Sequence, residues 1–257
     1  GLRVEGSSGD RTANPTASPE PRDAGPCDLV VLATKAMHVS QAASSIKPLL
    51  KSDTPVLSIQ NGLGGPDTAA SILGKDRVMV GVVGGFGASM RGPGHAHHNG
   101  MELVRLGEFG GPITERLKQV EAAWKSAGFR VKLFDDIDQL VWEKLLCNCA
   151  YSGPCAIAEC TIAEILGDPD LSRVSAACAT VGFEVALSRK IMLGFDDPVA
   201  YVREFGAKIP HARPSVLLDL MAKRKSEIDV INGSIPRPVN QAITQLVRAK
   251  ERRLGCQ

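Results

Sequence analysis

Three polar residues recur at four-residue spacing within an apolar segment. Lys144, Asn148 and Ser152 are separated by four residues each, so on a helix they share one face. A lysine surrounded by packed apolar side chains can have a lowered pKa, and it can then act as a proton donor. The alternative is a lysine that extends to solvent beside a surface amide. Taken alone, this segment favours the solvent-exposed lysine. Whether Lys144 is catalytic therefore depends on polar residues elsewhere in the sequence.

Two further polar residues follow apolar runs that are typical of buried strands. Lys35 follows the run at 28–34, and Asn61 follows the run at 55–60. Ligands of open α/β sheets bind beyond the carboxyl ends of the strands. Each residue also has a simpler interpretation: Asn61-Gly62 is a common turn sequence, and Lys35 could be a solvated loop residue. On the other hand, the glycines of 61–65 would let a ligand approach the backbone. Their common position at the sheet edge leaves a ligand-binding role open for both.

The third group lies near the end of the chain, around Ser215 and Glu227. Ser226 and Asp229 read as an N-cap and an acidic residue in the first turn of a helix, so Glu227 would begin that helix and be held ionised. On one straight helix, Ser215 and Glu227 would lie roughly 18 Å apart. We therefore expect a chain break around 223–225, which would let both face a ligand that Lys144 also contacts.

Histidines and cysteines at first suggest a metal site. His95 and His97 would share one face of a strand, but no acidic or thiol partner lies nearby at ligand spacing in the sequence, so we expect a solvated edge hairpin and no metal. The seven cysteines include a C-x-C pair, Cys147 and Cys149, and no second pair at zinc spacing. Buried free thiols of a reducing compartment, and thus a cytoplasmic protein, are the expectation.

Composition excludes several functional classes. A net charge of +2 and an aromatic content of 4% give no case for nucleic-acid binding. There is no apolar run of about eighteen residues, as a membrane-spanning helix would need, and the first residues do not resemble a secretory signal. Because the chain starts with Gly1 rather than methionine, we expect it to begin inside a longer protein.

The first half of the chain alternates between strand and helix patterns. Strands at 28–34 and 55–60 should be buried on both faces, and residues 7–26 should be loop with at most a short strand. Further strands are expected at 77–83 and 130–134, an antiparallel edge hairpin within 95–107, and helices at 39–50, 66–73 and 113–127. This alternation predicts a doubly wound α/β domain over 1–136.

The second half shows no strand pattern, so an all-helical domain is expected over 137–257. The expected helices are 138–151, 161–166, 169–192, 198–206, 214–223, 227–235 and 238–252.

Four motifs in this order resemble the ketopantoate reductase family, the 2-dehydropantoate 2-reductases. They are Leu32-Ala33-Thr34-Lys35-Ala36, Gln60-Asn61-Gly62-Leu63-Gly64, Trp142-Glu143-Lys144-Leu145 with Asn148, and Ser215 followed by Ser226-Glu227-Ile228-Asp229 and Ile231-Asn232-Gly233. The resemblance implies a Rossmann domain and a helical substrate or dimerisation domain, with NADPH and a 2-oxo acid in the cleft between them, and a possible homodimer.

The resemblance also implies a role for each site residue. Lys144 and Glu227 would be the catalytic residues: Lys144 would donate the proton to the ketone oxygen, and Glu227 would hold ligand hydroxyls and contact the cofactor. The remaining assignments are Asn61, Asn148, Ser152 and Ser215 for the substrate, and Lys35, Asn61 and Ala88 for the cofactor.

The chain departs from the family pattern in three places. The glycine-rich phosphate loop, within roughly one βαβ unit, is expected before Gly1. Ser152 stands where the family usually has a second asparagine. The segment 235–239 is abrupt, as though a connection between two helices were missing.

Three functional hypotheses follow from these residues. The first is NADPH-dependent reduction of 2-dehydropantoate to pantoate, in pantothenate and coenzyme A biosynthesis. The second, motivated by Ser152, is reduction of another branched 2-oxo acid or formation of an opine-type product. The third is a non-catalytic binding or dimerising remnant that lacks the phosphate loop; the presence of both Lys144 and Glu227 speaks against it.

Overall fold

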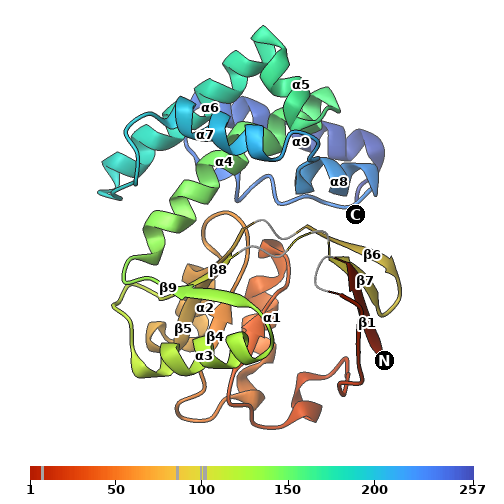
Figure 1. The fold of residues 1–257 in the computed structure, drawn as a ribbon, viewed down its shortest axis with the longest axis vertical. Coiled ribbons are helices and arrows are strands. Elements are labelled where there is room, and N and C mark those ends of the chain that lie inside the picture. The colour runs from red at the N-terminus through yellow and green to blue at the C-terminus, as the bar shows by residue number, and fades with distance from the viewer. Residues whose placement is uncertain (7–8, 85–86, 99, 101–102) are drawn as a thin grey trace. The chain divides into compact units, whose positions relative to one another are not determined.

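The computed structural model describes residues 1–6, 9–84, 87–98, 100 and 103–257 (Figure 1). The chain forms two compact units. The first contains 1–34, 38–60 and 65–137, and the second contains 35–37, 61–64 and 138–257. Two short loops that follow strands in the sequence are therefore packed within the second, helical unit.

A five-stranded, mostly parallel sheet forms the centre of the first unit. Its order is β3-β4-β5-β8-β9; β8 is antiparallel to β5, and every other neighbouring pair is parallel. The expected α/β fold followed by a helical part is thus confirmed. The strands are β3 (Val30–Leu32), β4 (Val56–Ser58), β5 (Val78–Val83), β8 (Leu103–Glu108) and β9 (Arg130–Leu133).

Helices cover both faces of this sheet. Val56 and Val78 pack with α1 (Val39–Ser45) and α2 (Gly65–Leu73). Leu57 and Met79, one residue further along β4 and β5, pack on the other face with α3 (Glu115–Ser126). Successive strand residues point to opposite faces, so the expected double burial holds for β4.

The prediction of double burial is wrong for β3, because Val31 keeps 39% of its surface exposed. Helix α3 packs on β8 and β9, at the far edge of the sheet from β3. Short 3-10 helices complete the connections of this half of the chain: η1 (Pro21–Ala24), η2 (Ala36–His38), η3 (Lys47–Leu49) and η4 (Lys75–Arg77).

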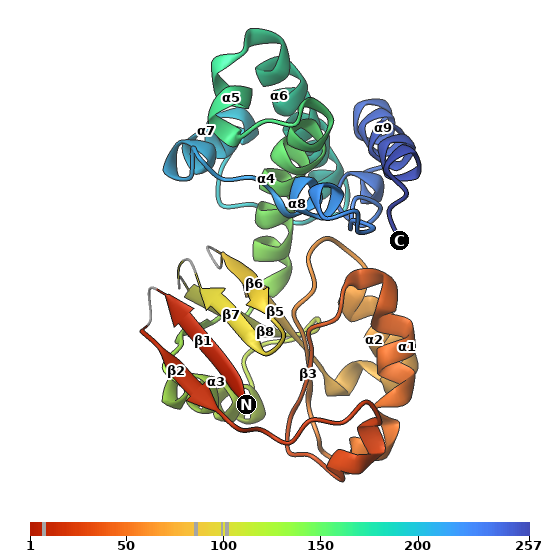
Figure 2. The same ribbon diagram turned by 90° about the vertical axis from the view of Figure 1, so that its right-hand side faces the viewer.

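A second sheet, of four strands in the order β2-β1-β7-β6, corrects another prediction (Figure 2). The expected edge hairpin over 95–107 does not form, because its two halves belong to different sheets. The first half pairs antiparallel with β6 and parallel with β1, and the second half is β8, inside the five-stranded sheet. The strands are β1 (Leu2–Gly6), β2 (Arg11–Ala13), β6 (Ala88–Gly92) and β7 (His95–His98).

Local capping signals set several helix starts in the second unit. The Thr161 side chain accepts a hydrogen bond from the Glu164 amide, and the Glu164 carboxylate accepts one from the Thr161 amide. Asp168 and Asp197 cap the two helices that follow. The helices are α4 (Ile137–Ala158), α5 (Ile162–Gly167), α6 (Pro169–Ser188), α7 (Pro198–Lys208), α8 (Ser215–Met221), η5 (Asn232–Ser234) and α9 (Pro238–Leu254).

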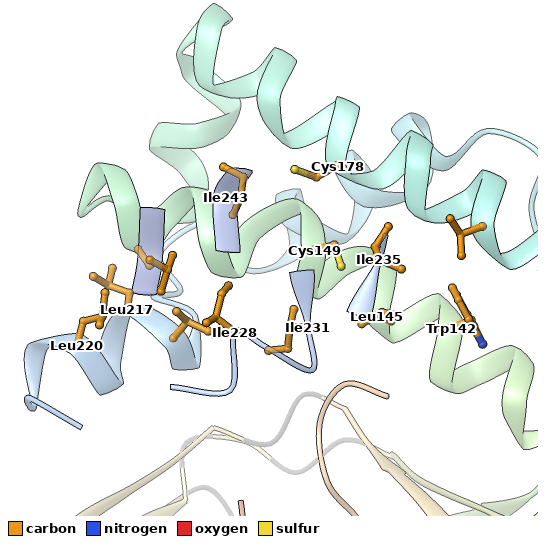
Figure 3. Packing of buried hydrophobic residues seen from close by; sticks show 14 of the residues in the cluster. Trp142, Leu145, Cys149, Cys178, Leu217, Leu220, Ile228, Ile231, Ile235 and Ile243 are labelled. Atoms are coloured by element: carbon orange, nitrogen blue, oxygen red, sulfur yellow. The ribbon is translucent and has the colours of Figure 1, made fainter. Parts of the chain in front are cut away.

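The core of the helical unit joins α4 to segments far along the chain. Leu145 and Cys149 of α4 pack with Ile228, Ile231 and other residues of a single apolar cluster (Figure 3). Leu145 is 1% exposed and Cys149 is fully buried. Among the described residues, no helix is long and apolar enough to cross a membrane.

Candidate functional site

The lysine of the four-residue repeat lies against the asparagine loop. Lys144 Nζ donates a hydrogen bond to Asn61 Oδ1 at 2.8 Å. Lys144 is half-buried, whereas Leu145 and Leu146 beside it are buried in the core. The buried apolar side chains thus hold α4 in the core, and the Lys144 ammonium group lies on the less buried side of the helix. The two residues thus meet in the structure, and such a cation can stabilise a developing negative charge or donate a proton.

The loop that carries Asn61 is held against the chain segment after α8. Leu63 N donates to Val230 O at 2.9 Å. Gly62 has φ +76°, and a Cβ at that position would lie 2.2 Å from Val230 O. Only glycine fits there without a shift, because both the backbone angle and the close approach exclude a side chain. Gly64 also has positive φ, but a Cβ added there would meet no atom within 4 Å, so the steric constraint at Gly62 does not extend to Gly64.

The chain break between Ser215 and Glu227 is confirmed. Helix α8 ends at Met221, and 224–226 has no helical structure. The expected helix over 227–235 is wrong. Residues 228–231 form turns that continue into η5, and the Gly233 amide donates to Ile228 O at 3.0 Å. This six-to-one bond is typical of a helix end, so a single turn forms and closes.

Ser226 makes a different set of bonds from the expected helix cap. Its Oγ accepts a long hydrogen bond from the Ile228 amide, at 3.4 Å, but it donates to Glu251 Oε1 at 2.6 Å. The Ser226 hydroxyl therefore donates its proton to a carboxylate from α9 and accepts only a long bond from the expected helix start.

The loop after β3 is anchored on the same segment. Glu227 Oε1 accepts a hydrogen bond from the Ala36 amide at 2.8 Å. Lys35 Nζ contacts Asp219 Oδ2 at 2.5 Å and Lys225 O at 3.2 Å. Lys35 is therefore not the solvated loop residue of the alternative interpretation, since its side chain is 34% exposed and ion-paired.

Asp219 is a residue to which the sequence analysis gave no role. It is 6% exposed and binds Arg224 Nε at 3.1 Å in addition to Lys35. A signal was present, because Asp219 lies four residues after Ser215 among apolar neighbours and so on the same helix face. Its basic partner, Lys35, is 184 residues away in the sequence, so the pair itself could not be found from spacing.

The other predicted site residues have different surroundings. Asn148 is half-buried, one turn after Lys144, whereas Ser152 is only 2% exposed. Ser215, the first residue of α8, is exposed. Ala88 begins β6 in the first unit and is exposed. Substrate and cofactor contacts by these four residues stay predictions.

The histidines have an acidic neighbour that their sequence position does not reveal. Glu5 on β1 lies 3.0 Å from His95 Nε2 and 3.5 Å from His97 Nδ1. The bond from His95 lowers the pKa of the Glu5 carboxyl. These histidines are half-buried rather than solvated, which corrects the expectation. Within the described ranges, no group of three or more His, Cys, Asp or Glu residues is placed to hold a metal ion.

All seven cysteines are free thiols, and five of them are buried. Burial raises the pKa of Cys147 and of Cys178 to about 12. Their thiolates are scarce at neutral pH, so these cysteines are structural rather than nucleophilic.

Comparisons with known proteins agree on one family. Residues 1–111 match the family model described as Ketopantoate reductase PanE/ApbA, and residues 136–251 match the model of its C-terminal part. A 2-dehydropantoate 2-reductase of Streptococcus pyogenes serotype M3 is 29% identical over 240 residues, which cover 90% of this chain and 78% of that protein.

Two solved structures are similar to the whole chain. A PanE/ApbA family ketopantoate reductase from Ralstonia eutropha JMP134 has a TM-score of 0.90 and 30% identity, over 99% of this chain and 86% of that one. D-mandelate dehydrogenase in a ternary structure with NADH and anilino(oxo)acetate has a TM-score of 0.88 and 26% identity, over the same shares of the two chains.

Proposed function

The chain belongs to the ketopantoate reductase family of oxidoreductases, and from this premise we propose that the protein reduces 2-dehydropantoate, or a related branched 2-oxo acid, with NADPH. The product of 2-dehydropantoate would be pantoate, a precursor of pantothenate and coenzyme A. The observation that carries this proposal is the Lys144–Asn61 hydrogen bond of 2.8 Å.

In the proposed reaction, Lys144 is the general acid. Reduction of a ketone places negative charge on its oxygen, and an adjacent ammonium group stabilises that charge and then supplies the proton. The nicotinamide cofactor supplies the hydride to the carbonyl carbon. Asn61 holds the ammonium through its Oδ1, which limits the positions that Nζ can adopt. Asn148 and Ser215 are proposed to bind the substrate, and Glu227 to hold ligand hydroxyls.

The loops in the second unit offer a feature that fits a nicotinamide nucleotide. The loop after β3 carries a cation, Lys35, whose position is fixed by its ion pair with Asp219. The related D-mandelate dehydrogenase was solved with NADH, which supports a nicotinamide cofactor of this kind. The 257 residues contain no G-x-G-x-x-G sequence, so the pyrophosphate cradle is expected outside them. Saturation kinetics with NADPH and NADH test the preference for NADPH.

A second candidate function is reduction of a different 2-oxo acid. Ser152 replaces the second asparagine of the family pattern and is 2% exposed. The neighbour that binds anilino(oxo)acetate is an example of a relative with another ligand of this class. A panel of 2-dehydropantoate, 2-oxoisovalerate and phenylglyoxylate, compared by kcat/KM, distinguishes the two candidates.

We also propose a cytoplasmic homodimer. Seven free thiols fit a reducing compartment, and apolar side chains on the outside of α8 and α9, such as Met221 and Leu246, are more than half exposed. Light scattering after size exclusion measures the oligomeric state.

Substitution of Lys144 tests the mechanism in the full-length protein. Lys144→Ala should lower kcat by about 10²–10⁴-fold, the usual contribution of general acid catalysis, while the KM for NADPH changes little. Lys144→Arg is the matched control, because it keeps the positive charge but cannot release a proton near neutral pH. It should retain ligand binding and still turn over slowly. Near-normal turnover of Lys144→Ala would remove Lys144 from the mechanism.

A further inference from the structure

The chain break after α8 is tied to the end of the C-terminal helix. The Ser226 amide and Oγ both donate to Glu251 Oε1, at 2.9 and 2.6 Å. Beside them, the Lys225 amide donates to Gln257 O at 2.9 Å, and the Gln257 amide donates to Lys223 O at 3.3 Å. Residues 223–226 are thus held by four bonds to α9 and the residues after it.

Glu251 is an unusual residue for a purely structural position. It is a carboxylate with 7% of its surface exposed, and Ser226 is 1% exposed. Burial of a charged group is unfavourable unless hydrogen bonds compensate it. Here the compensation comes from the backbone and side chain of the residue that immediately precedes Glu227.

The neighbours of Ser226 bind the loop after β3. Glu227 accepts the Ala36 amide at 2.8 Å, and Lys225 O accepts Lys35 Nζ at 3.2 Å. On the other side of Glu227, Ile228 is 1% exposed in the core of the helical unit (Figure 3). The backbone of Glu227 is therefore fixed by an apolar anchor on one side and by the Glu251 carboxylate on the other.

We propose that Glu251 is a positioning residue, which acts through Ser226 to hold the Glu227 carboxylate where it binds ligand and the Ala36 amide. This inference rests on the proposed function, in which Glu227 contacts the ligand. Glu251 itself touches neither substrate nor cofactor. Its effect on turnover arises because a displacement of about 1 Å at a ligand-binding group can lower the rate about 10²-fold.

The test compares two variants of Glu251 in the full-length protein. Glu251→Ala removes the oxygen that accepts both bonds and leaves a buried Ser226 amide without its partner, so kcat/KM for the 2-oxo acid should fall about 10²-fold. Glu251→Gln keeps an amide oxygen that can accept both hydrogen bonds, so it should stay close to wild type. Ser226→Ala removes only the hydroxyl donor, and its loss should lie between the two; this variant serves if Glu251→Ala does not fold.

A double-mutant cycle separates positioning from general destabilisation. If Glu251 acts through Glu227, then Glu251→Ala should add far less than 10²-fold in a Glu227→Gln background. Ser226→Ala replaces Glu251→Ala in the cycle if needed. The proposal would be overturned if Glu251→Ala lowered kcat/KM by the same factor with and without Glu227→Gln. It would also be overturned if Glu251→Gln were as impaired as Glu251→Ala.

Hydrogen exchange gives a readout that does not depend on the reaction. In Glu251→Ala the Ala36 amide should exchange faster, while the Gly194 amide, bound to Glu143 Oε1 at 2.9 Å elsewhere in the helical unit, should not change. Unchanged Ala36 exchange would refute the positioning role even if turnover falls. If no 2-oxo acid is reduced by the wild type, the proposed function fails, and faster Ala36 exchange alone would still support the positioning of Glu227.

Discussion

Gly62→Ala should displace the asparagine loop, because two separate effects act at this residue. Gly62 has φ +76°, and a left-handed conformation costs a non-glycine residue roughly 1–2 kcal/mol. The added Cβ would lie 2.2 Å from Val230 O, whereas carbon and oxygen normally approach to about 3.3 Å. The two segments must therefore separate by about 1 Å.

That separation breaks the hydrogen bond from Leu63 N to Val230 O, now 2.9 Å long. An ordinary hydrogen bond contributes about 0.5–1.5 kcal/mol, so Gly62→Ala should lower the free energy of unfolding by roughly 2–3 kcal/mol in total. Because Asn61 is the adjacent residue and accepts the Lys144 hydrogen bond, a shift of this size should also lower kcat by up to about 10²-fold.

Gly64→Ala is the matched control. Gly64 has φ +91°, yet no atom lies within 4 Å of an added Cβ, so only the backbone strain applies. Urea unfolding and steady-state kinetics of both variants measure the two effects. Gly64→Ala should lose about 1–2 kcal/mol of stability and keep most of its activity. If the two variants behave alike in stability and kcat, then contact with Val230 does not position Asn61.

Two further predictions concern pH and the cofactor. Burial raises the pKa of Cys147 and Cys178 from 9.0 to about 12, so as the pH rises these thiols ionise in the unfolded chain before they ionise in the folded protein. The free energy of unfolding should therefore be unaffected below pH 9. Between pH 9 and pH 12 it should fall by up to about 1.4 kcal/mol per pH unit for each thiol. Urea unfolding between pH 8 and 10 measures this slope, which Cys178→Ala should reduce, and an equal slope in that variant would contradict the assignment. The 257 residues alone should bind NADPH weakly, because they contain no G-x-G-x-x-G loop to place a pyrophosphate at a helix N-terminus. Calorimetric titration that gives micromolar affinity would disprove this expectation.

Local patterns in the sequence determined the elements and several contacts. Helical spacing around Lys144 predicted α4, and apolar runs predicted β4 and β5. The reach of a small ligand, together with a capping residue at Ser226, predicted the break after α8. The helix and the strands follow from interactions over a few residues, for which side-chain periodicity is sufficient. The break was inferred from the reach of a ligand instead.

Only the tertiary structure decided which distant segments pair. Apolar and polar residues alternate over 95–107 as they would in a hairpin. Which strands pair depends on every segment of the chain, however, and β7, the first half of this range, pairs with β1 and β6. In place of the expected helix at 227–235, a single turn forms, and the bond from the Gly233 amide to Ile228 O ends it. The ion pair of Lys35 with Asp219, and the bonds of Ser226 to Glu251, join residues 184 and 25 positions apart. No local pattern encodes such pairs, because their partners meet only when the second unit has brought together α8, the break, α9 and the loop after β3.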